Sequence, residues 1–340
     1  MPLMEPKYKR GVVIVKDYGG KFIRVSQHST LRTKGIVCDD EPPIEKGSVN
    51  DEKLDNNISR AKAMIYEYAV CNPWDWFLTL TLDKAKYNRY DLRLFHKALT
   101  KWISNYNKQH NLKIKFLLIP EQHKDGAWHI HGFLFGLPIE HLRLFTLQEH
   151  LPKYIRDKLK EGKSIYNWES YAAKFGFCDI EPIRNEEAVR KYVIKYITKD
   201  MSRCVTEINA HMYYCSRGLK RAEELKKGKL IDCDFTDIAP IDYENDYVRV
   251  AWLPHNEDIL QRLTQAVRTD RELKQEGQQN HDIASSTGGI PDRPTGERQH
   301  APDPALVQTI PGVLPHLCGP CPADGNNPPP MQTVLYPPDG

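Results

Sequence analysis

Residues 115–136 read KFLLIPEQHKDGAWHIHGFLFG, a pattern typical of a β-hairpin at the centre of a sheet. Two largely apolar runs, residues 115–123 and 128–136, flank an Asp-Gly pair, which is a strong signal for a β-hairpin. His129 and His131 are two residues apart in the second run, so their side chains project from the same face of the strand. The hairpin therefore presents two imidazoles side by side in an otherwise apolar sequence.

The length of the turn decides which other side chains share that face. A three-residue loop, residues 124–126, places Glu121 opposite His129 and gathers Glu121, His123, His129 and His131, whereas a two-residue loop reverses the arrangement. Three imidazoles and a carboxylate are costly in an apolar core unless they have partners, so we predict a metal site. Nitrogen and oxygen ligands suit Mn²⁺ or Zn²⁺, with Mg²⁺ an alternative if water or a substrate phosphate supplies further oxygens.

Two other histidine motifs fit less well. A histidine-triad hydrolase would need a third histidine at the position of Phe133, and the sequence contains no HExxH for a zinc protease. We therefore disfavour both of these hydrolase classes.

The segments on either side of the hairpin alternate between helix and strand patterns. We expect a helix capped by Asn57, a strand at 76–82, a helix capped by Asp91, the hairpin, a helical insert near 147–160, a strand at 175–183 and a helix from Glu186 to about Lys199. This order predicts an α+β fold with a central antiparallel sheet flanked by helices.

The helix expected at 186–199 carries a second set of reactive side chains. At about 100° per residue, its sequence places Ala188, Tyr192, Lys195, Tyr196 and Lys199 on one stripe and an apolar anchor on another. The stripe taken alone also fits an ordinary surface face with solvated lysines. Two tandem Tyr-x-x-Lys units, however, place two phenols about 6 Å apart, each followed by a cation one turn on.

Metal ligands and tyrosines together indicate phosphoryl transfer. A phenol with a pKa near about 10 is a weak nucleophile at neutral pH, but it serves if a metal polarises the phosphate and cations offset the developing charge. These parts suit cleavage of a phosphodiester through a covalent phosphotyrosine.

Three motifs in this order resemble those of the HUH endonucleases, in particular the rolling-circle replication initiators of phages and plasmids. They are Phe77-Leu-Thr-Leu-Thr81, Trp128-His-Ile-His-Gly132 and the tyrosine segment from Tyr192 to Lys199. The resemblance covers roughly residues 57–200. It implies that His129, His131 and the upstream Glu121 hold the ion, with His123 less favoured, and the tandem tyrosines resemble the two-tyrosine phage type. Ile130, between the histidines, is an ordinary hydrophobic substitution in the family's motif.

The resemblance also implies a function. Such proteins nick single-stranded or hairpin origin DNA, stay attached to the 5′ phosphate, leave a 3′ hydroxyl for a polymerase and later rejoin the displaced strand. Tyr192 would be the first nucleophile and Tyr196 its partner, while Lys195 and Lys199 steady the phosphate charge. A host helicase and polymerase are expected partners. A relaxase or tyrosine transposase of the same superfamily is an alternative, and a non-catalytic origin-binding factor is another.

Length and composition limit the class of protein and its division into domains. The chain has 340 residues with 40% hydrophobic residues, and it has no apolar run of the about 18 residues that a membrane span needs. We expect no membrane partner and a location in the host cell cytoplasm. We divide the chain into an N-terminal hairpin and polar arm at 1–55, an endonuclease domain at 56–265 and a disordered tail at 266–340.

The tail and the cysteines add little chemistry. Of the 24 prolines, 13 lie in the last 50 residues, which show no helix or strand periodicity. Cys318-Gly-Pro-Cys321 has the spacing of a redox motif, but it lies in this proline-rich stretch and we interpret it as coincidence. The segment 213–221 combines aromatic and basic residues, which fits base stacking on single-stranded DNA or a solvated helix start.

Overall fold

The computed structural model describes residues 8–33, 51–197, 211–276 and 278, with the backbone alone for 51–57 and 195–197. The described residues up to 269 form one compact unit, and those from 270 onward belong to a second unit. Of the second unit, the structure describes a helical backbone at 270–276. The predicted disordered tail and Cys318 and Cys321 lie almost wholly outside the described residues.

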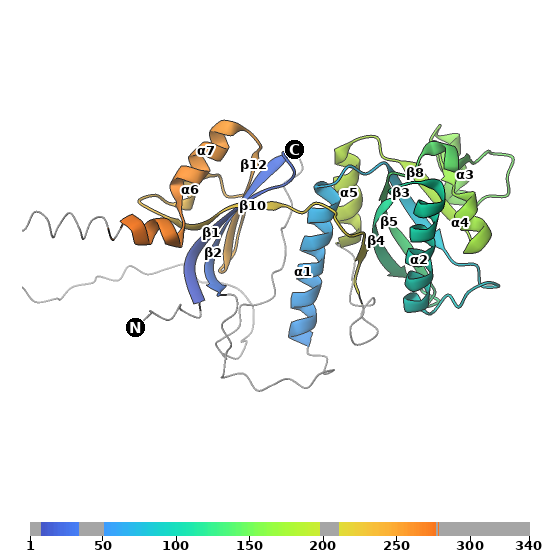
Figure 1. The fold of residues 1–340 in the computed structure, drawn as a ribbon, viewed down its shortest axis with the longest axis horizontal. Helices are drawn as coiled ribbons and strands as arrows, with labels where there is room; N and C mark the ends of the chain where they lie inside the picture. The colour runs from blue at the N-terminus through green and yellow to red at the C-terminus, as the bar shows by residue number, and fades with distance from the viewer. Residues whose placement is uncertain (1–7, 34–50, 198–210, 277, 279–340) are drawn as a thin grey trace, which may run out of the picture. The chain divides into compact units, whose positions relative to one another are not determined.

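The first unit contains two antiparallel sheets with helices packed on them, which makes it an α+β fold (Figure 1). The larger sheet is built on four main strands, all paired antiparallel. They are β3 (Trp76–Thr81), β4 (Lys115–Gln122), β5 (Trp128–Phe135) and β8 (Cys178–Pro182), with the short strands β6 (Arg143–Leu144), β7 (Tyr166–Asn167) and β9 (Tyr214–Cys215) at the edges. Their order across the sheet is β6-β7-β8-β3-β5-β4-β9.

The larger sheet is covered on both faces. The helices α2 (Leu92–His110) and α4 (Glu169–Lys174) pack on one face through a core that includes Leu78, Leu80 and Ile130. The helices α1 (Asp51–Val70) and α5 (Glu186–Ile197) lie side by side on the other (Figure 1). Asp91 caps α2 as predicted, since its carboxylate accepts from the Leu94 amide at 2.8 Å.

A glycine lets the strands of the hairpin approach closely. A Cβ atom at Gly132 of β5 would lie 2.1 Å from the carbonyl oxygen of Leu117 in β4, which is far inside van der Waals contact. Only glycine fits there without moving a backbone. This position fixes the spacing of the two strands that carry the predicted ligands.

The smaller sheet joins the two ends of the described chain. Its strands are β1 (Tyr8–Asp17), β2 (Phe22–Arg32), β10 (Glu223–Leu230), β11 (Tyr243–Glu244), β12 (Val248–Pro254) and β13 (Val267–Arg268), in the order β11-β12-β2-β1-β10-β13. The short helix α6 (Phe235–Ile238) and α7 (Glu257–Ala266) pack on it around a core containing Val13, Val25 and Ala251.

The N-terminal hairpin is therefore not a free arm. β1 pairs with β10 and β2 pairs with β12, which ties residues 8–32 to residues 223–254. The domain boundary that we expected at residue 55 does not anticipate this pairing. A hairpin can be predicted from local sequence, but the strands that pair with it in a sheet depend on contacts between distant segments.

Buried charge connects the smaller sheet to α1. Glu67 on α1 is only 4% exposed, and its carboxylate pairs with Lys16 Nζ of β1 at 2.7 Å and Arg221 Nε at 3.3 Å. Lys21, in the turn between β1 and β2, donates to the Val70 carbonyl at 2.8 Å. These contacts hold three distant segments of the chain together.

Several element boundaries differ from the sequence expectations. α1 begins at Asp51 rather than at Asn57, the helix of the insert, α3, runs only over Lys153–Lys160, and residues 213–221 contain β9 rather than a helix start. A 3-10 turn that was not expected (Ile139–His141) precedes the insert. β10 was not expected because its sequence, EELKKGKL, is rich in charge. Among the described residues, no helix has the length and apolar character needed to cross a membrane.

Candidate functional site

Polar side chains gather on one face of the larger sheet, inside an otherwise apolar surface. Glu121 pairs with His129 in the β4–β5 register, and on the other side of β5, Thr81 pairs with His129 and Thr79 with His131. Directly paired residues point to the same face of a sheet. The three-residue loop is therefore the one that forms, and Glu121, His129 and His131 share a face.

Glu121 and His131 are in direct contact. Oε2 of Glu121 lies 3.3 Å from Nε2 of His131, and the two side chains are 34% and 17% exposed. A carboxylate and an imidazole at this separation attract each other when the imidazole is protonated and can share a cation when it is neutral. The residue eight positions before His129 thus lies beside the histidine pair.

Two threonines of β3 orient the histidines. Thr79 Oγ1 lies 3.3 Å from Nδ1 of His131, and Thr81 Oγ1 lies 3.2 Å from Nδ1 of His129. Each hydroxyl engages Nδ1, so Nε2 remains the nitrogen that can meet a ligand. Sequence reasoning placed both threonines in the strand expected at 76–82 and in the first family-like motif, but it gave them no role of their own.

The His129 ring is crowded by other imidazoles. Between ring centroids, His123, in the turn just beyond β4, lies 3.2 Å from His129, and His131 lies 6.2 Å from His129. Burial, then the neighbouring His123 and His131, lower the pKa of His129 to about 4. At neutral pH His129 is therefore uncharged and keeps a lone pair for a ligand.

The donor atoms have the chemistry of a metal site. Nε2 of His129 is buried and has no hydrogen-bond partner among the described residues, which is costly unless something else binds there. Two imidazoles and a carboxylate suit a divalent cation. Nevertheless, within the part of the chain that the structure describes, no group of three or more His, Cys, Asp or Glu side chains is placed to hold a metal ion.

The tyrosine helix crosses the same face. The ring of Tyr192 on α5 packs 3.9 Å from the ring of Phe77 and 5.7 Å from that of Phe133, measured between centroids. Phe77 and Phe133 are a pair in the β3–β5 register, two residues along each strand from Thr79 and His131. Tyr192 therefore lies over the row of the sheet beyond the histidines.

The other predicted catalytic residues are only partly described. Lys195 and Tyr196 belong to the last turn of α5, and the structure describes their backbone alone. Lys199 lies outside the described residues. Asn185 begins the helix as expected, because its side chain accepts from the Ala188 amide at 2.8 Å.

Asp179 is a carboxylate that sequence reasoning missed. It lies on β8 opposite Thr79 and thus on the histidine face, it is 4% exposed, and the Tyr154 hydroxyl donates to it at 2.8 Å. Burial raises the pKa of Asp179 above its ordinary value. The signal was present, since Asp179 is a charged residue between Cys178 and Ile180 in an apolar strand.

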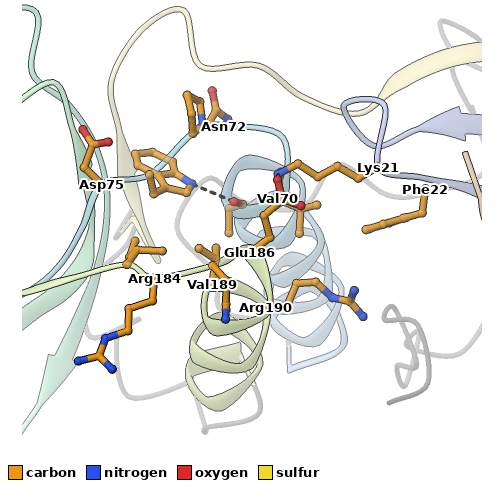
Figure 2. Close-up of a pocket in the computed structure, with 14 residues that line it drawn as sticks. Lys21, Phe22, Val70, Asn72, Asp75, Arg184, Glu186, Val189 and Arg190 are labelled. Atoms are coloured by element: carbon orange, nitrogen blue, oxygen red, sulfur yellow. Dashed lines mark hydrogen bonds and ion pairs between the residues drawn. The ribbon is translucent and has the colours of Figure 1, made fainter. Parts of the chain in front are cut away.

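A separate pocket of about 350 Å³ lies at the start of α5, away from the histidines. Figure 2 shows residues that line it, with the Arg184 and Arg190 side chains extending in opposite directions. Lys21 bridges it by contacting both the Val70 carbonyl and the Glu186 carboxylate, the latter at 2.9 Å. Because its lining residues connect the N-terminal hairpin to α1 and α5, we interpret this pocket as part of the scaffold.

Fold and site together define an α+β domain whose antiparallel sheet carries paired histidines on the face that a tyrosine-bearing helix covers. Residues 75–201 match the family model of replication-associated protein ORF2/G2P. This segment is a little over a third of the chain, and it contains Glu121, His129, His131 and Tyr192. Comparisons with curated proteins and with solved structures gave no match. The family match supports a replication-associated role.

Proposed function

We propose that this protein is a rolling-circle replication initiator that nicks and rejoins single-stranded origin DNA through a covalent phosphotyrosine. The observation that carries the proposal is that two sets of residues lie on the same face of the larger sheet. Glu121, His129 and His131 lie on the strands, and Tyr192 lies on the covering helix. The match of residues 75–201 to a replication-associated family supports the same conclusion.

His129, His131 and Glu121 would hold a divalent cation, Mn²⁺ or Mg²⁺ with Zn²⁺ as a further candidate. The cation would supply polarisation of the scissile phosphate. Thr79 and Thr81 keep Nε2 of each histidine directed away from β3, so the donors are oriented before any ligand binds.

Tyr192 is the proposed first nucleophile. Its phenol oxygen attacks the scissile phosphorus, a bond forms between tyrosine and the 5′ phosphate, and the bond to the 3′ oxygen breaks. The phenol proton leaves with the 3′ oxygen, which becomes the free 3′ hydroxyl. Phe77 and Phe133 pack against the ring of Tyr192 and restrict the orientations that its side chain can adopt.

Tyr196 is the proposed second nucleophile, one helical turn or about 6 Å further along α5. Two tyrosines let one hold the first 5′ end while the other cleaves the regenerated origin. Lys195 and Lys199 would offset the charge that develops on the phosphate. The 3′ hydroxyl would serve a host polymerase, with a host helicase opening the duplex.

The test is a covalent adduct. Labelled single-stranded DNA with the candidate origin is incubated with protein and Mn²⁺ or Mg²⁺, and denaturing electrophoresis reports label retained on the protein. We expect an adduct with the wild-type protein, none with the double variant Tyr192→Phe/Tyr196→Phe, and a weakened one with each single variant. Tyr247→Phe, just before β12 of the smaller sheet, is the matched control and should behave as wild type.

Other outcomes separate the alternatives. His129→Ala should remove the adduct without removing DNA binding. An adduct formed only on a transfer origin or on a transposon end would assign a relaxase or transposase instead. DNA binding with no adduct under any metal would contradict the catalytic proposal and favour a non-catalytic origin-binding factor.

A further inference from the structure

The loop between β3 and α2 is fastened to the turn of the histidine hairpin. The Trp128 amide donates to the Arg89 carbonyl at 2.9 Å, and the Trp128 indole donates to the Tyr90 carbonyl at 3.2 Å. Arg89 also pairs with Asp125 in the turn at 3.0 Å. Because His129 follows Trp128, this loop has a fixed position at the histidine end of the sheet.

Tyr90 is held on one side of its ring and open on the other. Its ring lies against Gly126, where a Cβ atom would be 3.6 Å from Cδ1 of Tyr90, yet the residue is 61% exposed. Leu94, one helical turn further on, is also 61% exposed. A large aromatic ring fixed by its backbone and exposed to solvent contributes little to the core and is suited to stacking.

The surroundings of Tyr90 are basic. Residues 83–97 contain five Lys or Arg residues and two Asp residues. Both carboxylates are engaged locally, since Asp83 accepts from the Ala85 amide and Asp91 caps α2. Arg93 and Lys97 follow Tyr90 closely in sequence, are exposed, lie one turn apart (i, i+4) at the start of α2, and form no ion pair within the described part of the chain.

We infer that Tyr90, Arg93 and Lys97 form a platform that binds single-stranded DNA at the turn end of the histidine hairpin, with a base stacked on Tyr90 and phosphates on the two cations. Aromatic stacking next to exposed cations is how proteins bind single strands without reading their sequence. The inference rests on the proposed function in placing a DNA strand at His129. Charge favours this occupant over a second copy of the chain, whose matching surface would be equally basic.

The experiment measures binding separately from cleavage. Fluorescence anisotropy with labelled oligo(dT) in EDTA gives Kd for wild type, Tyr90→Ala, Tyr90→Phe and Arg93→Gln/Lys97→Gln. We expect Tyr90→Ala to weaken binding at least about fivefold and Tyr90→Phe to bind as wild type, because phenylalanine retains the stacking ring. Leu147→Ala, at an exposed apolar residue of another loop, is the control and should not change Kd.

Two further arms define how the strand is bound. The double cation variant should flatten the slope of log Kd against log salt, by about 0.7 for each phosphate that is no longer neutralised. A duplex of the same sequence should bind Tyr90→Ala as tightly as wild type, because its bases are already stacked.

The inference is overturned if Tyr90→Ala binds oligo(dT) as wild type does, or if wild type does not bind it. It is also overturned if Tyr90→Ala instead dissolves a dimer seen by light scattering, which would make this surface a self-association face. The adduct assay tests the proposed function separately. If wild type forms no adduct but Tyr90→Ala still weakens DNA binding, the nicking function is contradicted and the platform is supported.

Discussion

The hydroxyl of Thr81 lies 3.2 Å from Nδ1 of His129, and this contact leaves the opposite nitrogen of the imidazole, the buried Nε2, directed away from β3. Thr79 and His131 repeat the relationship one row away. A threonine pair on one strand thus orients a histidine pair on its neighbour, which makes β3 a supporting strand for the proposed metal site.

Replacing these hydroxyls should weaken metal binding without unfolding the protein. We expect Thr79→Val/Thr81→Val to lower Mn²⁺ affinity by about 10- to 100-fold, because the histidines lose the contacts that fix their rings. Isothermal titration calorimetry with Mn²⁺ gives the affinity. Thr79→Ser/Thr81→Ser keeps the hydroxyls and should bind Mn²⁺ as wild type does. If the two double variants lose Mn²⁺ affinity equally, the effect belongs to the strand rather than to the hydroxyls.

Gly132→Ala should destabilise the fold, because its new methyl group would collide with the Leu117 carbonyl at 2.1 Å. Overpacking of this kind costs about 1–3 kcal/mol or more of the free energy of unfolding. Urea denaturation measures it. Gly162→Ala is the comparison: its φ of 77° carries backbone strain, but nothing lies within 4 Å of the new atom. A loss at Gly132 no larger than at Gly162 would argue against the close approach.

The stability of the smaller sheet should depend on pH through His28. Burial, then the positive charges of Arg24, Lys227 and Lys16, lower the pKa of His28 to about 4. The unfolded chain therefore takes up the proton first, so stability is retained above pH 6.5 and lost as the pH falls toward 4. The loss reaches up to about 3 kcal/mol.

His28→Gln removes this titration, and its amide can still hydrogen-bond to Ser26, whose hydroxyl lies 3.2 Å from Nε2 of His28. Urea denaturation of both proteins between pH 7.5 and 4 gives two stability curves, and we expect the variant to lose less stability on acidification. Two parallel curves would contradict the assignment to His28.

Glu67→Gln should cost about 1–3 kcal/mol of unfolding free energy. The substitution leaves Lys16 and Arg221 facing a neutral amide at a buried position. Glu244→Gln is the matched control, because its pair with Arg249 at 2.5 Å is exposed and should cost less than about 1 kcal/mol. Thermal unfolding compares them, and similar losses would contradict a special role for Glu67.

The local parts of the site could be predicted from sequence because each has a short-range cause. The Asp125-Gly126 pair predicts the hairpin although it leaves two registers open, alternation in residues 76–82 predicts the faces of β3, and Asp91 and Asn185 mark helix starts. The contacts that complete the site have no such cause. Asp179 reaches the histidine face only through pairing of β8 with β3, and Tyr192 meets Phe77 only when α5 folds back over the sheet.

The smaller sheet shows the same limit more strongly. The sequence of residues 8–32 does not indicate that β1 and β2 pair with β10 and β12. In addition, β10 is rich in lysine and so lacks the apolar alternation by which a strand is predicted. The sequence left two hairpin registers open, and the structure has the one that puts Glu121, His129 and His131 on one face. Their role as metal ligands stays a prediction, as do the catalytic roles of Tyr192, Tyr196, Lys195 and Lys199.

The pairing of β1 and β2 with β10 and β12 has a consequence during synthesis. The first strands emerge from the ribosome early but must wait for the last ones, whereas β3, β4, β5 and β8 can pair once residue 182 has emerged. The histidine face thus forms before the sheet that fastens the N-terminus. A nascent chain from which residue 197 but not residue 223 has emerged would carry the strands of the proposed site already paired, with the N-terminal hairpin still open to other partners.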